Sequence, residues 1–207
     1  TDDTTAQHVT ETLAALHAAG HALFVMHGNR DLLLGAEFCA ATGATLLHDP
    51  TVATIAGQNV LLAHGDAWCT ADVAYQAFRT QVRNPQWQRS FLAQDLSARK
   101  AFVERARAGS ESAKQEKSID IMDVTPDEIS AAFIAHQVTR MVHGHTHRSA
   151  VHRTQVQGIE RERWVLPDWD FDHAATPRGG YLRVLDVRVP EGAWVLESAV
   201  TDTSGSH

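Results

Sequence analysis

Three short polar turns carry the residues whose types and spacing suit phosphate chemistry. Each follows an apolar run, and the three turns read Gly28-Asn29-Arg30-Asp31, His64-Gly65-Asp66 and Gly144-His145-Thr146-His147. An amide oxygen and imidazole nitrogens suit manganese, iron or zinc better than magnesium or calcium. An arginine beside them offers a planar fork of donors that matches a phosphate group. The turns therefore predict a site where a divalent cation meets a phosphate-bearing ligand.

The turns are expected to share one rim of a sheet, because ligands of open α/β sheets bind beyond the carboxyl ends of the strands. Each turn alone also fits a plain structural role, such as a tight turn at Asn29 or a hydrogen-bonded strand-end imidazole at His64. The pair His145 and His147 favours ligation more strongly. Alternate residues of an extended segment point to the same side, so both rings are expected to face the same ligand.

The segments around these turns predict an α/β protein that forms a single domain over residues 1–207. Apolar runs and turn residues predict a strand buried on both faces, a helix closed by Gly43, a hairpin, a helix starting at Thr125, and later strands. In chain order the strands cover 21–26, 52–55, 60–63, 138–142, 164–166, 181–189 and 194–200, and the short helix covers 36–42. Helical spacing of apolar residues over 72–107 predicts a helical insertion at about 72–117.

Composition and charge limit the classes of function. The chain has 207 residues, of which 43% are hydrophobic and 21% charged, so a folded globular domain is expected. The net charge of −7 argues against a nucleic-acid module, although residues 79–117 hold nine basic residues against four acidic ones and suit an anionic partner. Two cysteines and no apolar run of membrane-spanning length favour a cytoplasmic protein.

In their order along the chain, the three turns resemble the later motifs of the calcineurin-like metallophosphoesterases. The resemblance covers roughly residues 26–150, and its supporting runs are His64-Gly65-Asp66-Ala67-Trp68-Cys69-Thr70, Asp72, Tyr75-Gln76-Ala77-Phe78-Arg79, Lys117-Ser118, Ile121-Met122-Asp123-Val124 and His143-Gly144-His145-Thr146-His147-Arg148. It implies a sandwich of two mixed β-sheets flanked by helices, with the helical insertion as a cap.

The resemblance also assigns roles to individual positions. It implies two Mn²⁺ ions in a complete protein, with Asn29, His64, His145 and His147 as metal ligands. It makes Arg30 and His145 the catalytic residues that meet phosphate oxygens. The substrate contacts that it implies are Asn29, Arg30, Asp72, Ser110, Lys114, Lys117 and His145. The two lysines also fit the solvated face of a helix.

Within this family the likeness is greatest to members that act on a UDP-linked diacyl glucosamine lipid in lipid A biosynthesis. The implied reaction is attack of hydroxide on the α-phosphorus of the pyrophosphate, which releases UMP and the diacylglucosamine 1-phosphate. The implied location is the cytoplasmic face of the inner membrane, as a peripheral protein. There the insertion would shelter acyl chains and meet anionic headgroups through Arg83, Arg89, Arg99 and Arg105, although ordinary helix packing explains its apolar spacing equally well.

Two motifs of the family have no counterpart here. The Asp-x-His motif of its first strand and the Gly-Asp motif of its second, whose Asp bridges the two metals, are both absent from the 207 residues. We expect the chain to be a fragment of a longer one that carries these ligands. Two alternatives stay open: a non-catalytic fragment that binds a lipid nucleotide or a single metal, and a metallophosphoesterase that acts on another phosphodiester.

Overall fold

The computed structural model describes residues 3–116, 121–171, 177–185 and 194–199, and over 110–116 it describes the helix but not the side chains. The chain forms two compact units, each assembled from separate stretches. The first unit comprises Thr1–Leu23, His27–Thr45 and Asp66–Glu128, and the second comprises Phe24–Met26, Leu46–Gly65 and Ile129–His207.

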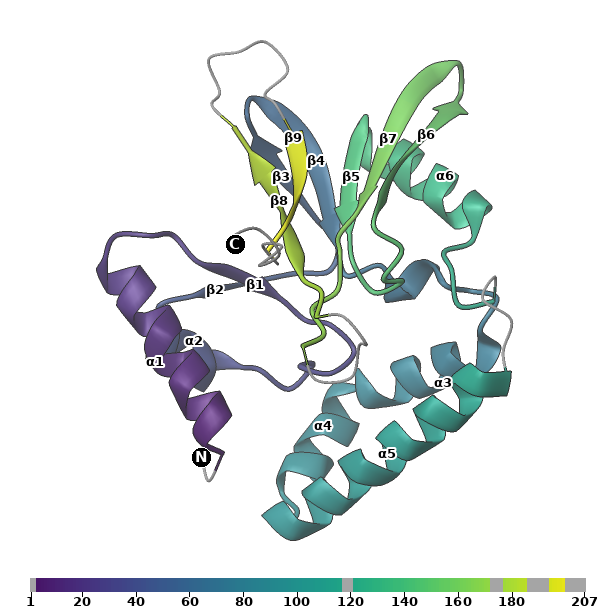
Figure 1. Cartoon of the computed structure of the whole chain (residues 1–207). Coiled ribbons are helices and arrows are strands. Elements are labelled where there is room, and N and C mark those ends of the chain that lie inside the picture. Colours follow the sequence, from purple (N-terminus) through teal and green to yellow (C-terminus); the bar gives the residue numbers. More distant parts are fainter. Residues whose placement is uncertain (1–2, 117–120, 172–176, 186–193, 200–207) are drawn as a thin grey trace, which may run out of the picture. The chain divides into compact units, whose positions relative to one another are not determined.

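The first unit is helical in its described part (Figure 1). Its helices are α1 (Thr4–Ala18), α2 (Ala36–Thr42), the short 3-10 helix η1 (Asp66–Trp68), α3 (Val73–Val82), α4 (Pro85–Leu92) and α5 (Leu96–Glu116). The side chains of Asp3, Asp72 and Asn84 accept backbone N–H groups at the starts of α1, α3 and α4. The prediction of α2 is confirmed, with Gly43 closing it at a φ of 72°.

An aromatic cluster joins α4 to α5, two helices that lie in the segment predicted as an insertion. Trp87 stacks on Phe91 with ring centroids 4.9 Å apart, and Phe102 of α5 lies 5.6 Å and 5.3 Å from these two rings. Phe91 is 5% exposed, so this cluster is an apolar core of its own. None of the helices in the described residues is long and apolar enough to cross a membrane.

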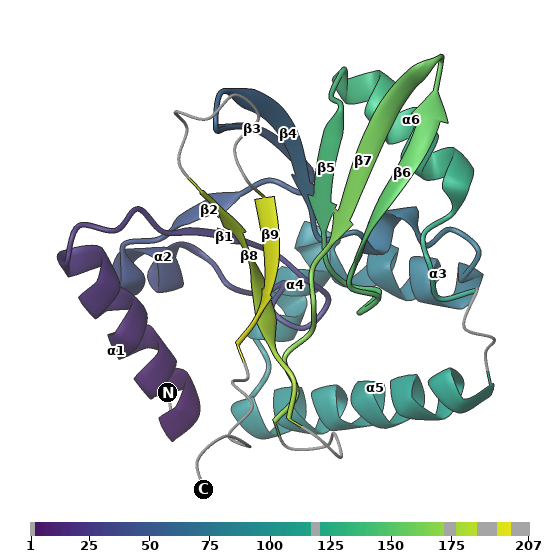
Figure 2. The same cartoon turned by 45° about the horizontal axis from the view of Figure 1, so that its top comes forward.

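The second unit is built on a mixed five-stranded sheet, visible in Figures 1 and 2. Its strands are β3 (Thr51–Ile55), β4 (Gln58–Ala63), β5 (Arg140–His143), β6 (Ala150–Val156) and β7 (Ile159–Val165), in the spatial order β3-β4-β5-β7-β6. The three inner strands β4, β5 and β7 run parallel, and the two outer strands are antiparallel to their neighbours. The carboxyl ends of β4, β5 and β7 therefore lie at one edge of the sheet.

Both faces of this sheet are covered. Helix α6 (Pro126–His136) lies on one face, as Figures 1 and 2 show. Phe133 of this helix is buried. On the other face, β8 (Gly180–Val184) and β9 (Trp194–Ser198) form an antiparallel pair whose Leu182, Trp194 and Leu196 pack on a cluster around Trp164. The predicted α/β class is therefore confirmed. The expected sandwich of two mixed sheets stays a prediction, because within the described residues β8 and β9 form a two-stranded antiparallel ribbon.

Several strand predictions need correction. The strand predicted over 21–26 is only β1 (Phe24–Met26), which pairs with the short β2 (Thr45–Leu47). It is not buried on both faces, because these two strands make a sheet of their own and Phe24 stays 62% exposed. Strand β6 was not predicted, and residues 186–189 and 200 of the last predicted strands lie outside the described residues.

Candidate functional site

The edge formed by β4, β5 and β7 brings two of the predicted metal ligands together. His64 follows β4 and His145 follows β5, and their rings meet edge to face with centroids 4.9 Å apart. The backbone around them is fixed, since Gly144 donates to the carbonyl of His64 (3.1 Å) and the N–H of His64 donates to Oδ1 of Asp49 (3.0 Å). The prediction that these two turns share one rim is confirmed.

The two histidines of the last turn face different partners. His145 and His147 have φ angles of 67° and 56°, and Thr146 donates back to the carbonyl of Gly144 (2.8 Å), so the segment is a tight turn. The segment is therefore not extended, as the expectation about the two rings had assumed. His145 lies against His64, whereas Nδ1 of His147 lies 3.3 Å from Oδ2 of Asp168. Left-handed angles at non-glycine residues are uncommon and concentrate at functional sites.

His143, the last residue of β5, has a structural role. Its buried ring has Nε2 3.0 Å from an Arg163 guanidinium nitrogen and Nδ1 2.8 Å from the carbonyl oxygen of Gly144. Because arginine can only donate, Nε2 must accept, and the ring proton on Nδ1 then donates to the carbonyl. The ring is thus engaged through both nitrogens and anchors the strand end that carries His145.

Gly65 is required where β4 turns away from this edge. Its φ is +107°, and a Cβ at this position would lie 2.7 Å from Nδ1 of His143. We expect Gly65→Ala to lower the free energy of unfolding by about 3 kcal/mol, from backbone strain and displacement of the His143 ring. Gly158→Ala is the matched control, because Gly158 has a φ of +74° with open space around it. It is expected to cost about 1 kcal/mol; equal losses in urea unfolding would contradict a special role for Gly65.

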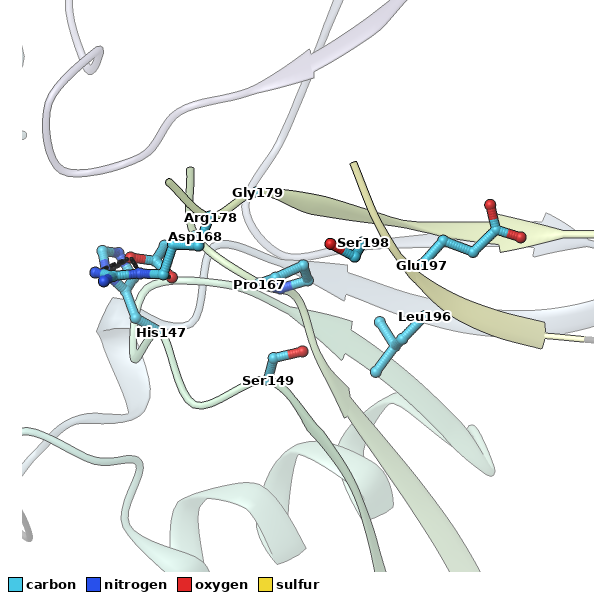
Figure 3. Close-up of a pocket in the computed structure, with 9 residues that line it drawn as sticks. All are labelled: His147, Ser149, Pro167, Asp168, Arg178, Gly179, Leu196, Glu197 and Ser198. Atoms are coloured by element: carbon cyan, nitrogen blue, oxygen red, sulfur yellow. Dashed lines mark hydrogen bonds and ion pairs between the residues drawn. The ribbon is translucent and has the colours of Figure 1, made fainter. Parts of the chain in front are cut away.

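A cavity of about 430 Å³ opens beside His147 in the second unit (Figure 3). It lies at the end of β7 and beside β9, and its lining residues are His147, Ser149, Pro167, Asp168, Arg178, Gly179, Leu196, Glu197 and Ser198. Its volume is in the range of small-molecule pockets. Hydrogen bonds from the Arg178 guanidinium lower the pKa of the Asp168 carboxyl below its ordinary value, and the nearby His147 adds to this effect. Sequence reasoning did not identify Asp168, because no motif surrounds it.

In the first unit, helix α3 holds the turn that carries Asn29 and Arg30. Nη2 of Arg83 donates to the carbonyl oxygens of His27 and Gly28, each at 3.4 Å. The side chains of Asn29 and Arg30 are exposed at this turn and are accessible to a ligand. Arg83 was expected to meet lipid headgroups, but in the structure it braces this turn.

The same arginine belongs to a buried charge cluster around Asp66. The Asp66 side chain is fully buried, and its Oδ2 accepts from the Tyr75 hydroxyl (2.8 Å) and from Arg83 (3.3 Å) and lies 3.1 Å from Nε of Arg79. Burial, reinforced by the charge of Asp66, raises the pKa of Tyr75, so that its hydroxyl stays protonated and donates. Two residues of the run Tyr75-Gln76-Ala77-Phe78-Arg79, which the sequence singled out, thus hold the side chain of Asp66 from α3.

Four of the predicted substrate contacts, Asp72, Ser110, Lys114 and Lys117, lie in or near α3 and α5, and the structure describes the side chain of Asp72 alone among them. Asp72 is the N-cap of α3, where its Oδ1 accepts from the backbone of Tyr75 (3.0 Å), and it is 9% exposed. Ser110 and Lys114 lie in the last turns of α5, where side chains are not described, and Lys117 lies outside the described residues. The structure therefore leaves these three as predictions.

The metal ligands that the sequence proposed are divided between the units. His64, His145 and His147 belong to the second unit, and Asn29 belongs to the first. Within the described residues, no group of three or more His, Cys, Asp or Glu side chains could hold a metal ion. The adjacent imidazoles of His64 and His145 nevertheless fit the nitrogen part of a site for a cation such as manganese.

Fold and site together define an α/β protein whose candidate ligands stand beyond the carboxyl ends of parallel strands. No protein-family model matches the chain. Curated relatives do match. The UDP-2,3-diacylglucosamine hydrolase of Bordetella pertussis is 51% identical over 174 residues, which cover 82% of this chain and 67% of the relative. The chain belongs to the UDP-2,3-diacylglucosamine hydrolase family.

Further relatives of the same name extend the match. That of Chromobacterium violaceum is 47% identical over 188 residues, which cover 89% of this chain and 76% of the relative. That of Bordetella parapertussis is 52% identical over 160 residues, which cover 77% of this chain and 62% of the relative. The chain thus spans about two thirds of the length of its Bordetella relatives.

Proposed function

We propose that this protein hydrolyses the pyrophosphate bond of UDP-2,3-diacylglucosamine, a step of lipid A biosynthesis. The products are UMP and 2,3-diacylglucosamine 1-phosphate. The observation that carries the proposal is that about half of the aligned positions, over most of the chain, are identical to those of hydrolases named for this substrate. The paired imidazoles of His64 and His145 at a strand edge support it.

In this proposal different residues of the chain bind the cation and the phosphate. In the second unit, His64, His145 and His147 would hold Mn²⁺. Asn29 stays a predicted ligand, and Arg30 a predicted donor to the phosphate oxygens. When bound, the cation would neutralise phosphate charge and lower the pKa of a water molecule toward neutrality. In this proposal His145 would contact both the cation and the phosphate.

Isotope tracing tests the proposal directly. The full chain is incubated with UDP-2,3-diacylglucosamine in detergent micelles, Mn²⁺ and ¹⁸O-labelled water, and the products are analysed by mass spectrometry. We expect UMP that carries one ¹⁸O, because attack at the α-phosphorus places the new oxygen there. Label in the lipid phosphate would refute attack at the α-phosphorus. Manganese binding without release of UMP would favour the non-catalytic binding alternative, and turnover of only a soluble diester would favour another substrate.

Exposed apolar residues of α4 and α5 suit a lipid substrate at the cytoplasmic face of the inner membrane. Leu92, Leu96 and Val103 are 48%, 46% and 38% exposed, whereas Phe91 is buried in the aromatic cluster. The sequence allowed two roles for the apolar residues of the insertion, contact with acyl chains and packing between helices. We assign these roles to different residues. Phe91 packs the helices, and the exposed leucines are the ones we propose to contact acyl chains, with Arg89 and Arg105 exposed nearby on the same helices.

Replacing Leu92 and Leu96 with serine separates these roles. We expect the double variant to lose about tenfold in kcat/KM on the diacyl substrate, because each leucine loses part of its apolar contact. Hydrolysis of bis(p-nitrophenyl) phosphate and the melting temperature should not change. Leu16→Ser on α1 is the control, since Leu16 is 41% exposed but lies outside α4 and α5. Equal loss on both substrates would contradict acyl contact.

A further inference from the structure

Two neighbouring aromatic side chains of the segment after β7 are exposed to solvent. Trp169 and Phe171 are 59% and 53% exposed, and their ring centroids lie 5.9 Å apart with the ring planes tilted by 35°. Both rings lie against the backbone of Gly179, where a Cβ would stand 2.8 Å from Cε3 of Trp169 and 3.3 Å from Cε2 of Phe171. Single exposed apolar residues need no explanation, but contiguous ones commonly mark a binding surface. We call this pair of rings the aromatic platform.

The backbone that carries the aromatic platform is tied on both sides. Asp170 and Arg178 exchange two backbone hydrogen bonds (2.8 Å and 3.0 Å), and Nε1 of Trp169 donates to the carbonyl of Gly180 (2.8 Å). The Arg178 guanidinium donates from Nε to both carboxylate oxygens of Asp168 (3.1 Å and 3.0 Å) and from Nη2 to Oδ2 (2.8 Å). The rings thus have a fixed position before any ligand binds, which lowers the entropy cost of binding a flat ligand on them.

The aromatic platform adjoins the predicted metal ligand His147 within the second unit. Asp168, the residue before Trp169, has its Oδ2 3.3 Å from Nδ1 of His147. Asp168 and Gly179 both line the cavity beside His147, as Figure 3 shows. Consecutive Cα atoms are about 3.8 Å apart, and in a uridine nucleotide a single ribose separates the base from the α-phosphate. A phosphate bound near His147 therefore leaves the base within reach of the platform.

We propose that Trp169, together with Phe171, stacks on the uracil ring of the substrate and so sets specificity for a nucleotide. The identity of the base rests on the proposed function. Aromatic side chains bind bases through their π faces. The nearby charges favour a neutral, flat ring over an anionic bilayer, because the acidic residues Asp168 and Asp170 flank Trp169 in the chain, whereas basic residues attract such a bilayer.

Two ligands that differ only by the base test this proposal. The full chain is titrated in a calorimeter, in the presence of Mn²⁺, with UMP and with ribose 5-phosphate, which has the sugar phosphate but no uracil. We expect Kd for UMP to rise about 5–150-fold in Trp169→Ala, the range for loss of one stacked base, and Kd for ribose 5-phosphate to stay unchanged. Trp169→Phe keeps a π face and should retain most of the preference for UMP.

Phe24→Ala is the matched control for these titrations. Phe24 is an aromatic residue of the same unit and is 62% exposed, but it lies in β1, so both Kd values should stay unchanged. Equal weakening of both ligands in Trp169→Ala overturns the platform, since it would reflect a general disturbance of the site. If Trp169→Ala does not fold, Trp169→Leu replaces it, because leucine keeps an apolar side chain against Gly179 without a π face.

Further outcomes separate the platform from the other assignments. Equal affinity of the unchanged protein for UMP and ribose 5-phosphate overturns the platform even if the lipid substrate is hydrolysed. A preference for UMP that is lost in Trp169→Ala, without release of UMP from UDP-2,3-diacylglucosamine, would refute the proposed function and leave the platform intact. If Trp169→Ala instead keeps the preference for UMP but sediments less with vesicles of phosphatidylethanolamine and phosphatidylglycerol, the platform is overturned and the rings contact a membrane surface.

Discussion

Replacing His145 with alanine is expected to lower kcat/KM for release of UMP by about 10³-fold. Loss of a single group that stabilises charge in the transition state typically costs about 10²–10³-fold, and in the proposed mechanism His145 contributes to both cation and phosphate binding. Its ring also forms the edge-to-face pair with His64. The measurement is steady-state hydrolysis of UDP-2,3-diacylglucosamine at saturating Mn²⁺, together with Mn²⁺ affinity, which we expect to weaken in parallel.

His136→Ala is the control for this substitution. His136 is exposed in the last turn of α6 and is not one of the predicted ligands or substrate contacts, so its loss should leave hydrolysis unchanged. The result that contradicts the assignment is a His145→Ala variant that retains more than about a tenth of the activity. Such a variant would limit His145 to packing against His64.

Replacing Asp66 with alanine is expected to lower the free energy of unfolding by about 3–5 kcal/mol. Removing one partner of a buried ion pair leaves its counter-charges without compensation. Here the carboxylate has no exposed surface and lies within 3.3 Å of Arg79 and Arg83, whose side chains are 22% and 21% exposed. Urea unfolding gives the magnitude. Hydrogen exchange gives the location, since protection should fall in α3 and in the turn at Gly28 that Arg83 holds.

Two further variants test whether the loss of stability comes from the buried carboxylate of Asp66. Glu104→Gln removes an exposed carboxylate from α5 and should stay within about 0.5 kcal/mol of the unchanged protein. Tyr75→Phe removes only the hydroxyl that donates to Asp66 and should cost about 1.5–3 kcal/mol, the range for a hydrogen bond to a charged group. If Asp66→Ala proves no more damaging than Glu104→Gln, the cluster does not stabilise the first unit.

Local sequence signals predicted the parts of the site that lie directly after a strand. The apolar runs of β4 and β5 and the polar glycine turns after them placed His64 and His145 correctly at one edge, because parallel neighbours end at the same side. The end of α2 at Gly43 and the start of α6 at Thr125-Pro126 were also predicted, because the signals for each lie within a few residues. Such signals do not depend on the rest of the chain.

The remaining features depend on contacts between distant residues. Strand β6 is an edge strand with mostly exposed polar residues, so it shows no alternation of apolar and polar positions. Asp168 acquires its partner only because β7 lies beside β5, and Asp66 acquires Arg83 from one helix further along. The tight turn at His145 and His147 was not predicted, since left-handed angles at these residue types leave no signature in sequence.

The parallel pairing of β4 with β5 also affects how the protein is made. Its register joins Val60 to Arg140, so the partners of this pair are separated by eighty residues of chain. At a synthesis rate of about 5–20 residues per second, β4 leaves the ribosome roughly 4–16 seconds before β5. During this interval its inner edge has no neighbour and is open to pairing with another chain. The histidine pair forms only after that delay, so a nascent chain carries His64 alone and is expected to need protection from aggregation before it can hold a cation.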